Sequence, residues 1–260
     1  MEVVIVENRE SGARLVADAI ATLVDRLEHP VLGLATGGTP EPVYEELARR
    51  YERGELSFAQ CRAFLLDEYV GLPADHPESY RSVIHRQVVA RLDLPSAAVR
   101  GPDGNARDVE QACAEYDEAV RAAGVDLQLL GVGTDGHVGF NEPGSSLASR
   151  TRMKTLNAQT RRDNARFFGG DVEAVPHHVL TQGIGTILAA KHLLVLAWGS
   201  AKADAVAKLA EGPLTAMVPA SALQLHPHAT LVTDEDAASK LELADYYRET
   251  YAAKPDWQGL

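Results

Sequence analysis

The sequence has few cysteines and no excess of positive charge. Cys61 and Cys113 are the only two cysteines among 260 residues. A secreted domain stabilised by disulfides would carry more, so we expect both thiols to stay reduced. The formal net charge of −12 argues against nucleic acid as a partner, because nucleic acid needs a basic face. A few local Lys, Arg and backbone N–H groups can still bind a small anion.

Long apolar runs are also lacking. No run approaches the roughly 20 residues that span a bilayer. The opening segment, Met1–Ile5, lacks the basic region and cleavage site of a signal peptide. We therefore expect a cytoplasmic protein with no membrane partner.

Short apolar runs alternate along the chain with longer amphipathic stretches, and no linker or repeat divides it. This alternation predicts an α/β fold with a mostly parallel sheet covered by helices on both faces. The expected strands are Val3–Val6, Val31–Ala35, Ala63–Leu66, Val125–Val132, His192–Trp198 and Ala229–Val232. The expected helices are 10–27, 41–53, 79–92, 107–123, 201–210 and 239–252. Ligands of such sheets lie beyond the carboxyl ends of the strands.

The first unusual strand end is the turn Thr36–Pro40, which follows Val31–Ala35. Gly37 and Gly38 let backbone N–H groups approach a ligand closely. Together with Thr39 they open into a helix N-terminus, which predicts an anion site. The alternative is a tight strand–helix turn with a threonine cap.

Two adjacent acids, Asp67 and Glu68, close the next strand. Burying carboxylates at this edge costs free energy, so their presence there indicates a function. A carboxylate at this position is a candidate general base. The alternative is a pair of solvated acids, one of which caps a turn.

The segment Gly131–Pro143 is the richest in chemistry. It contains a formal GxGxxG match, but the dinucleotide fingerprint continues directly into a helix, and later Gly, Asn and Pro residues keep this segment irregular. Asp135, His137 and Glu142 remain. A histidine beside carboxylates can be held in one tautomer and act as an acid or base. The alternatives are a structural histidine, or a metal site that lacks a second histidine.

Basic residues provide the remaining signals. Lys202 lies in the first turn after a strand and can share a phosphate with the glycine-rich turn; the alternative is an exposed lysine. The stretch Arg150–Lys154 and the nearby Arg166 form a local basic cluster in an acidic chain, which predicts one or more anion sites. For Arg161 and Arg162 we expect only a solvated charged face.

Three long strings in this order resemble the glucosamine-6-phosphate deaminase family. They are Asp67–Leu72 followed by His76–Tyr80, then Gly131–Leu156, then Leu223–Pro227. The resemblance covers nearly the whole chain and implies a Rossmann-like fold, with residues 1–260 as a single deaminase-type domain. It implies a hydrolase that converts glucosamine 6-phosphate to fructose 6-phosphate and ammonia, by ring opening and enolisation at C2, with no cofactor and no metal.

The resemblance also implies roles for single residues. Asp67 is the base that moves the C2 proton. His137 opens the sugar ring, oriented and tuned by Asp135 and Glu142. The substrate phosphate is held by Gly37, Gly38, Thr39, Arg166 and Lys202.

Some members of this family are hexamers activated by N-acetylglucosamine 6-phosphate. By resemblance, that effector site involves Ser145, Arg152, Lys154, Thr155 and a C-terminal tyrosine, either Tyr246 or Tyr247. We therefore expect a homo-oligomer of up to six subunits, with this effector as a second small-molecule partner.

Two other functions compete with the deaminase. A 6-phosphogluconolactonase has a related fold and phosphate turn but needs no base at C2, so the Asp67–Tyr69 block and the Ser145–Arg152 string favour the deaminase. A non-catalytic sugar-phosphate sensor normally follows a basic helix-turn-helix, and no basic module of this kind is seen in this sequence. Sensing also needs no complete set of acids and bases, which this sequence has.

Overall fold

The main sheet of the computed structural model, which describes residues 1–73 and 75–260, has seven strands in the order β1-β10-β9-β6-β2-β3-β5. Every neighbouring pair is parallel, as the alternating pattern predicts. From β2 the chain adds β3 and β5 outward on one side, and from β6 it adds β9 and β10 outward on the other, where β1 forms the edge beyond β10. This reversal between β2 and β6 creates the crevice in which α/β sheets bind ligands. The strands are β1 (Glu2–Val6), β2 (Val31–Leu34), β3 (Arg62–Leu65), β5 (Val99–Arg100), β6 (Leu127–Gly131), β9 (Leu193–Ala197) and β10 (Ala229–Asp234).

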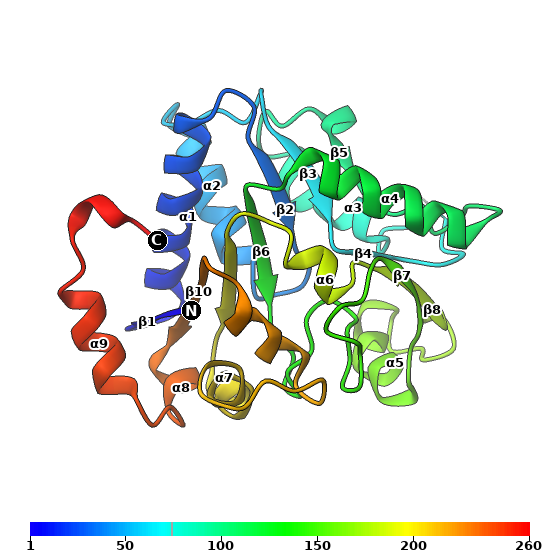
Figure 1. Cartoon of the computed structure of the whole chain (residues 1–260). Coiled ribbons are helices and arrows are strands. Elements are labelled where there is room, and N and C mark those ends of the chain that lie inside the picture. Colours follow the sequence, from blue (N-terminus) through cyan, green and yellow to red (C-terminus); the bar gives the residue numbers. More distant parts are fainter. Residues whose placement is uncertain (74) are drawn as a thin grey trace.

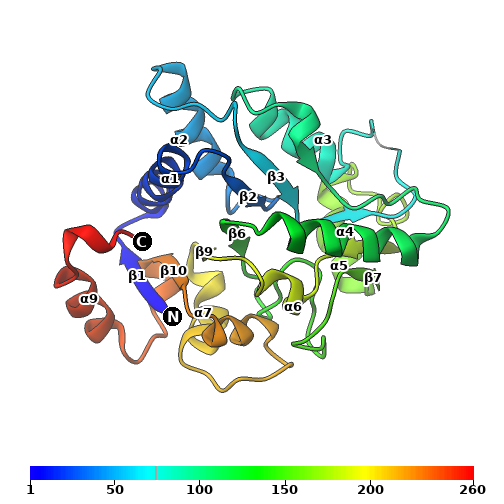
Figure 2. The same cartoon turned by 45° about the horizontal axis from the view of Figure 1, so that its top comes forward.

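Helices cover both faces of this sheet (Figures 1 and 2). Alternate residues of a strand point to opposite faces, so Leu193 and Val195 join the core beneath α4, α6 and α7, whereas Leu194 and Leu196 join the core beneath α1 and α2. The α-helices are α1 (Arg9–Arg26), α2 (Glu41–Glu52), α3 (Tyr80–Ile84), α4 (Val109–Ala123), α5 (Ala158–Asn164), α6 (Ile184–Ile187), α7 (Ala203–Ala210), α8 (Glu235–Ala238) and α9 (Ala244–Ala252). Shorter helical turns are η1 (His85–Val89), η2 (Ser96–Ala98), η3 (Ala165–Phe167), η4 (Ser200–Lys202), η5 (Pro219–Leu225) and η6 (Asp256–Gln258).

A second, antiparallel sheet lies beside the first, in the order β4-β8-β7. Its strands are β4 (Asp67–Tyr69), β7 (Arg152–Thr155) and β8 (His178–Thr181). None of the three is predicted from the sequence. Their pairing is long-range, with Asp67 opposite Thr181, and polar residues interrupt the apolar pattern that marks a strand.

Two predicted helices differ from those observed. The segment 79–92 begins as α3 and continues as η1, a π-helical turn. The helix predicted over 239–252 is observed only over α9, because residues 239–243 form the turn that follows α8. Leu241 is buried within that turn, and its packing into the core takes precedence over local helix propensity.

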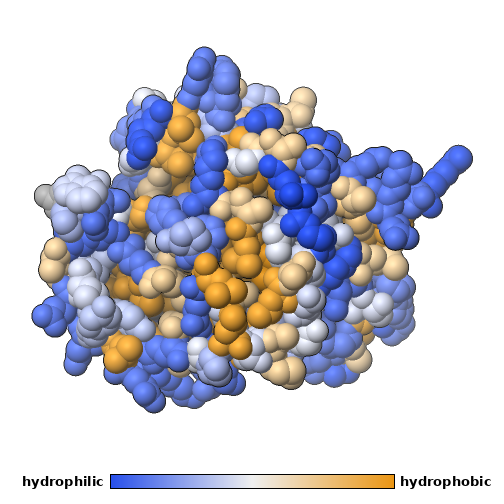
Figure 3. Space-filling view, in the orientation of Figure 1, coloured by the Kyte–Doolittle hydropathy of each residue, from blue (hydrophilic) through white to orange (hydrophobic). Residues whose placement is uncertain are grey.

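The molecular surface is mainly hydrophilic around the rim of the face seen in Figure 3, and apolar residues gather near its centre. Among the described residues, no helix is both long and apolar enough to cross a membrane.

Candidate active site

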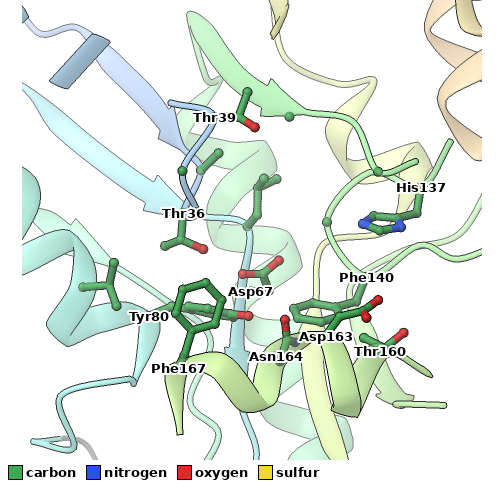
Figure 4. Close-up of a pocket in the computed structure, with 18 of the residues that line it drawn as sticks. Thr36, Thr39, Asp67, Tyr80, His137, Phe140, Thr160, Asp163, Asn164 and Phe167 are labelled. Carbon is green, nitrogen blue, oxygen red and sulfur yellow. The ribbon is translucent and has the colours of Figure 1, made fainter. Parts of the chain in front are cut away.

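A cavity of about 870 Å³ lies at the carboxyl ends of β2 and β6. It is walled on one side by α3 and η1 and on another by α5 and η3. Figure 4 shows Asp67 near its centre, with His137 on one side and Tyr80 and Phe167 on the other. The predicted site residues that line it are Gly37, Gly38, Thr39, Asp67, His137, Glu142, Arg166 and Lys202. Residues from distant parts of the sequence therefore meet where the topology of the sheet places a ligand.

The glycine-rich turn is open toward this cavity. Gly37 has φ +95°, a left-handed conformation that glycine adopts at low cost. A Cβ built on Gly37 or Gly38 would meet no atom within 4 Å, so a ligand can approach the backbone there. The carbonyl of Thr39 accepts a hydrogen bond from Trp198 Nε1 at 2.9 Å, which fixes the end of the turn.

Lys202 and Arg166 bring positive charge to the same cavity. Lys202 is partly buried, and this burial lowers the pKa of its ammonium group; Asp135 raises that pKa and Arg166 lowers it further. Arg166 is exposed, and its guanidinium lies 4.7 Å from the ring centroid of Phe167. Two cations that destabilise each other without a ligand are suited to sharing an anion.

Asp67 is a buried carboxylate that faces the cavity, only 5 % exposed. Burial and the neighbouring charge of Glu68 raise the pKa of Asp67 to about 8. A base whose pKa lies near neutral pH is strong enough to remove a carbon-bound proton and is still ionised often enough to act. The alternative interpretation of Asp67 and Glu68 as solvated acids is wrong, because both side chains are buried.

His137 is held by Asp135. The carboxylate oxygen Oδ1 of Asp135 lies 2.6 Å from His137 Nδ1 and also accepts a hydrogen bond from His137 N at 3.1 Å. The hydrogen bond to His137 lowers the pKa of Asp135 to about 2, against the opposing effect of partial burial. An ionised Asp135 keeps the proton on Nδ1 and leaves Nε2 free for chemistry.

Glu142 lines the same cavity but is held by different partners. Asn157 Nδ2 donates to Glu142 Oε2 at 3.0 Å, and the Thr160 hydroxyl donates to Oε1. Both donors belong to the start of α5 or its N-cap. The carboxylate that binds His137 is thus Asp135, and tuning of His137 by Glu142 stays a prediction.

The cavity also has an aromatic wall that the sequence motifs do not predict. The rings of Tyr69, Tyr80, Phe140 and Phe168 line the cavity and pack on one another, with Tyr69 and Tyr80 stacked at 4.8 Å between ring centroids. Tyr69 and Tyr80 lie in strings that carry the family resemblance, and Phe140 lies in another, but spacing alone does not distinguish a cavity wall from an ordinary core. Asn164 joins this wall by donating to the hydroxyl of Tyr69 at 3.2 Å.

The predicted basic cluster separates in the structure. Arg161, expected on a solvated face, is instead 8 % exposed and donates to the carbonyls of Val172 and Val175, so that prediction is wrong. Arg150 donates to Asp117 on α4 at 3.0 Å through Nε and to Gly185 O at 3.1 Å. Both are structural residues.

The residues predicted for an effector site do not form one cluster within a single chain. Arg152, Lys154 and Thr155 belong to β7, whereas Tyr246 lies on α9 at the opposite end of the molecule (Figures 1 and 2). Ser145 is buried, and its hydroxyl has no hydrogen-bond partner in the part of the chain that the structure describes. Tyr246 is 58 % exposed, whereas its neighbour Tyr247 packs against the core.

Metal ligands were one alternative for the Asp135–His137–Glu142 segment. Among the side chains that the structure describes, no group of three or more from His, Cys, Asp or Glu is placed to hold a metal ion.

Comparison with known proteins decides the family. The model for glucosamine-6-phosphate isomerases and 6-phosphogluconolactonases matches residues 7–232. The chain belongs to this family. A glucosamine-6-phosphate deaminase of Beutenbergia cavernae is 66% identical over the full length of both chains.

Solved structures separate the two branches of the family. A monomeric glucosamine-6-phosphate deaminase is 43% identical, with a TM-score of 0.89, covering 92% of this chain and 100% of its own. A 6-phosphogluconolactonase from Thermotoga maritima is 22% identical, with a TM-score of 0.69, covering 90% of this chain and 98% of its own. The lactonase shares the fold, and the deaminases share the sequence as well.

Proposed function

We propose that this chain converts glucosamine 6-phosphate and water to fructose 6-phosphate and ammonia. The observation that carries the proposal is the buried Asp67 carboxylate, which shares one cavity with His137 and with the glycine-rich turn. Similarity to deaminases along the whole chain supports it. We propose that residues 1–260 act as one deaminase-type domain.

The chemistry requires two proton-handling groups in sequence. The cyclic sugar must open first, which moves a proton from the C1 hydroxyl to the ring oxygen; His137 is suited to this because Asp135 fixes its ring. The C1 carbonyl then makes the C2 proton acidic, and Asp67 removes it.

Transfer of that proton to C1, with an amine proton passing to the C1 oxygen, leaves a C1 hydroxyl and an imine at C2. Water adds to the imine, and ammonia leaves as the ketone forms. The electrons rearrange within the substrate, so the reaction balances without an oxidant. Because water replaces the amine, the net reaction is a hydrolytic deamination.

The lactonase alternative differs in its products. We expect ammonia and fructose 6-phosphate from glucosamine 6-phosphate with a metal chelator present, and little hydrolysis of 6-phosphogluconolactone. Rapid lactone hydrolysis without ammonia would transfer the proposal to the lactonase branch. Tight binding of the sugar phosphate without turnover would favour a sensor.

The raised pKa of Asp67 predicts a pH dependence. The base acts only when ionised, and its pKa is raised from 3.8 to about 8 by burial and by Glu68. Below that pH, kcat/KM should fall roughly tenfold per pH unit. An activity that stays constant from pH 8 down to pH 5 would contradict the assignment of Asp67 as the base.

Replacing Lys202 with methionine tests the phosphate site. A lost charge-assisted hydrogen bond is worth about 1.5–3 kcal/mol, so KM should rise roughly 10- to 100-fold with a smaller change in kcat. The matched control is Lys208→Met, which removes an exposed lysine from α7 in the same part of the chain. Equal KM values for the two variants would remove Lys202 from the phosphate site.

Regulation, assembly and location stay predictions. We propose that Ser145, Arg152, Lys154 and Thr155 serve N-acetylglucosamine 6-phosphate binding, and that a tyrosine of α9 contributes only if subunits associate, up to a hexamer. The rate against substrate concentration, measured with and without this effector, tests the proposal. An unchanged hyperbolic curve would contradict it. A cytoplasmic location is also proposed.

A further inference from the structure

Glu68 is a buried acid next to Asp67 that the reaction scheme does not use. Successive side chains of a strand point to opposite faces, so Asp67 faces the cavity while Glu68 faces α3. Glu68 Oε1 accepts hydrogen bonds from the backbone N–H groups of Tyr69 at 2.9 Å and Tyr80 at 3.0 Å. Its Oε2 accepts from Arg81 N at 3.0 Å. Both oxygens of this carboxylate are thus engaged by the backbone.

These bonds tie β4 to the first turn of α3. Tyr80, the first residue of α3, lines the cavity and stacks on Tyr69. Its hydroxyl donates to the Tyr69 hydroxyl at 3.2 Å, which also accepts from Asn164. One carboxylate therefore holds the strand that carries Asp67, and the aromatic wall beside it, in a single geometry. Figure 4 shows Tyr80 and Asp67 side by side in the cavity.

We propose that Glu68 is a positioning residue: without lining the cavity, it fixes the wall formed by Tyr80 against the strand that carries Asp67. Its effect on turnover rests on the proposed function. Its effect on Asp67 does not, because the two carboxyl groups are neighbours whatever the substrate.

The charge of Glu68 also affects the pKa of the neighbouring Asp67. Tyr69 on β4, Tyr80 on α3 and Tyr116 on α4 also interact with Asp67. Burial raises the pKa of each of these phenols, so they stay neutral near pH 7. Burial raises the pKa of Glu68, whereas its three backbone N–H donors and Arg81 lower it and favour the carboxylate. The negative charge of that carboxylate raises the pKa of Asp67. Removing its charge should therefore let Asp67 ionise at lower pH.

Glu68→Gln, Glu68→Asp and Glu45→Gln separate the two effects. In Glu68→Gln an amide group replaces the carboxylate, so one N–H donor of the backbone loses its acceptor; we expect kcat/KM to fall about tenfold or more, with KM raised. The acid limb of the pH profile should also move to lower pH. Glu68→Asp keeps the charge but shortens the side chain, so KM should rise while the acid limb stays. Glu45 is exposed on α2, and Glu45→Gln should behave as the unaltered protein.

A titration without substrate makes the inference independent of turnover. The carboxyl carbon of Asp67 can be followed by NMR in protein labelled with 13C-aspartate, with Asp67→Asn to identify the signal. A titration midpoint that moves to lower pH in Glu68→Gln, and not in Glu68→Asp or Glu45→Gln, supports the inference even if glucosamine 6-phosphate is not turned over, in which case the proposed function alone fails. An unchanged midpoint in Glu68→Gln overturns the inference. If the enzyme is active, unaltered kcat, KM and acid limb in Glu68→Gln also overturn it. If Glu68→Gln does not fold, a wild-type KM in Glu68→Asp overturns the positioning role.

Discussion

Replacing Asp67 with asparagine lowers kcat by about 10²- to 10⁴-fold, the usual contribution of a positioned general base. Asparagine has nearly the shape of aspartate, so the cavity keeps its form while the base is removed. KM should change little, because proton removal belongs to the transition state and not to substrate binding. Steady-state kinetics on glucosamine 6-phosphate measures both constants. Asp25→Asn, an exposed acid on α1, is the matched control.

Stability distinguishes a lost base from a damaged fold. The pKa of Asp67 is raised from 3.8 to about 8, so between these values the folded protein binds a proton that the unfolded chain does not. The free energy of unfolding therefore decreases as pH rises through this window. Asp67→Asn removes the buried charge and should have a higher Tm than the unaltered protein above pH 8. A lower Tm there would mean that the lost activity reflects misfolding.

Replacing His137 with glutamine should lower kcat/KM by about 10²- to 10³-fold, because the proposed ring opening then lacks its acid and base. Asp135→Asn should have a smaller effect of the same kind, since it removes the acceptor that fixes the His137 ring. His29→Gln is the control, because His29 is an exposed histidine. Steady-state kinetics on glucosamine 6-phosphate provides the comparison.

The two variants of the pair also test each other. We expect His137 and Asp135 to act as a unit, so the double variant should be only slightly worse than His137→Gln alone. If the loss of kcat/KM in the double variant equals the product of the losses in the two single variants, the two residues act separately. A His137→Gln enzyme with the unaltered rate would mean that the sugar opens without help from the protein.

The sequence predicts the part of the site that depends on the parallel sheet. Gly37, Lys202 and His137 each follow an apolar run, and parallel strands bring their carboxyl ends to one edge. That topology follows from strand–helix alternation, which is a local pattern. The sequence alone therefore predicts that the glycine-rich turn and the acid and base lie close together, without knowledge of any long-range contact.

The rest depends on contacts between distant residues. The pairing of β4 with β8 joins Asp67 to Thr181, and no local pattern indicates it. Arg161 looks like a surface charge until the carbonyls of Val172 and Val175 enclose its guanidinium. Glu68 likewise reads as a solvated acid, because its three donors become its partners only when α3 meets β4.

Cleavage of the C2–H bond of glucosamine 6-phosphate tests the central claim most directly. In D₂O, proton NMR follows the loss of the C2 proton from the substrate and shows whether hydrogen or deuterium is added at C1 of fructose 6-phosphate. Release of ammonia is measured alongside. We predict that the unaltered protein breaks this bond and that Asp67→Asn, folded and able to bind substrate, does not. A folded Asp67→Asn enzyme that breaks the C2–H bond at the unaltered rate would contradict the account.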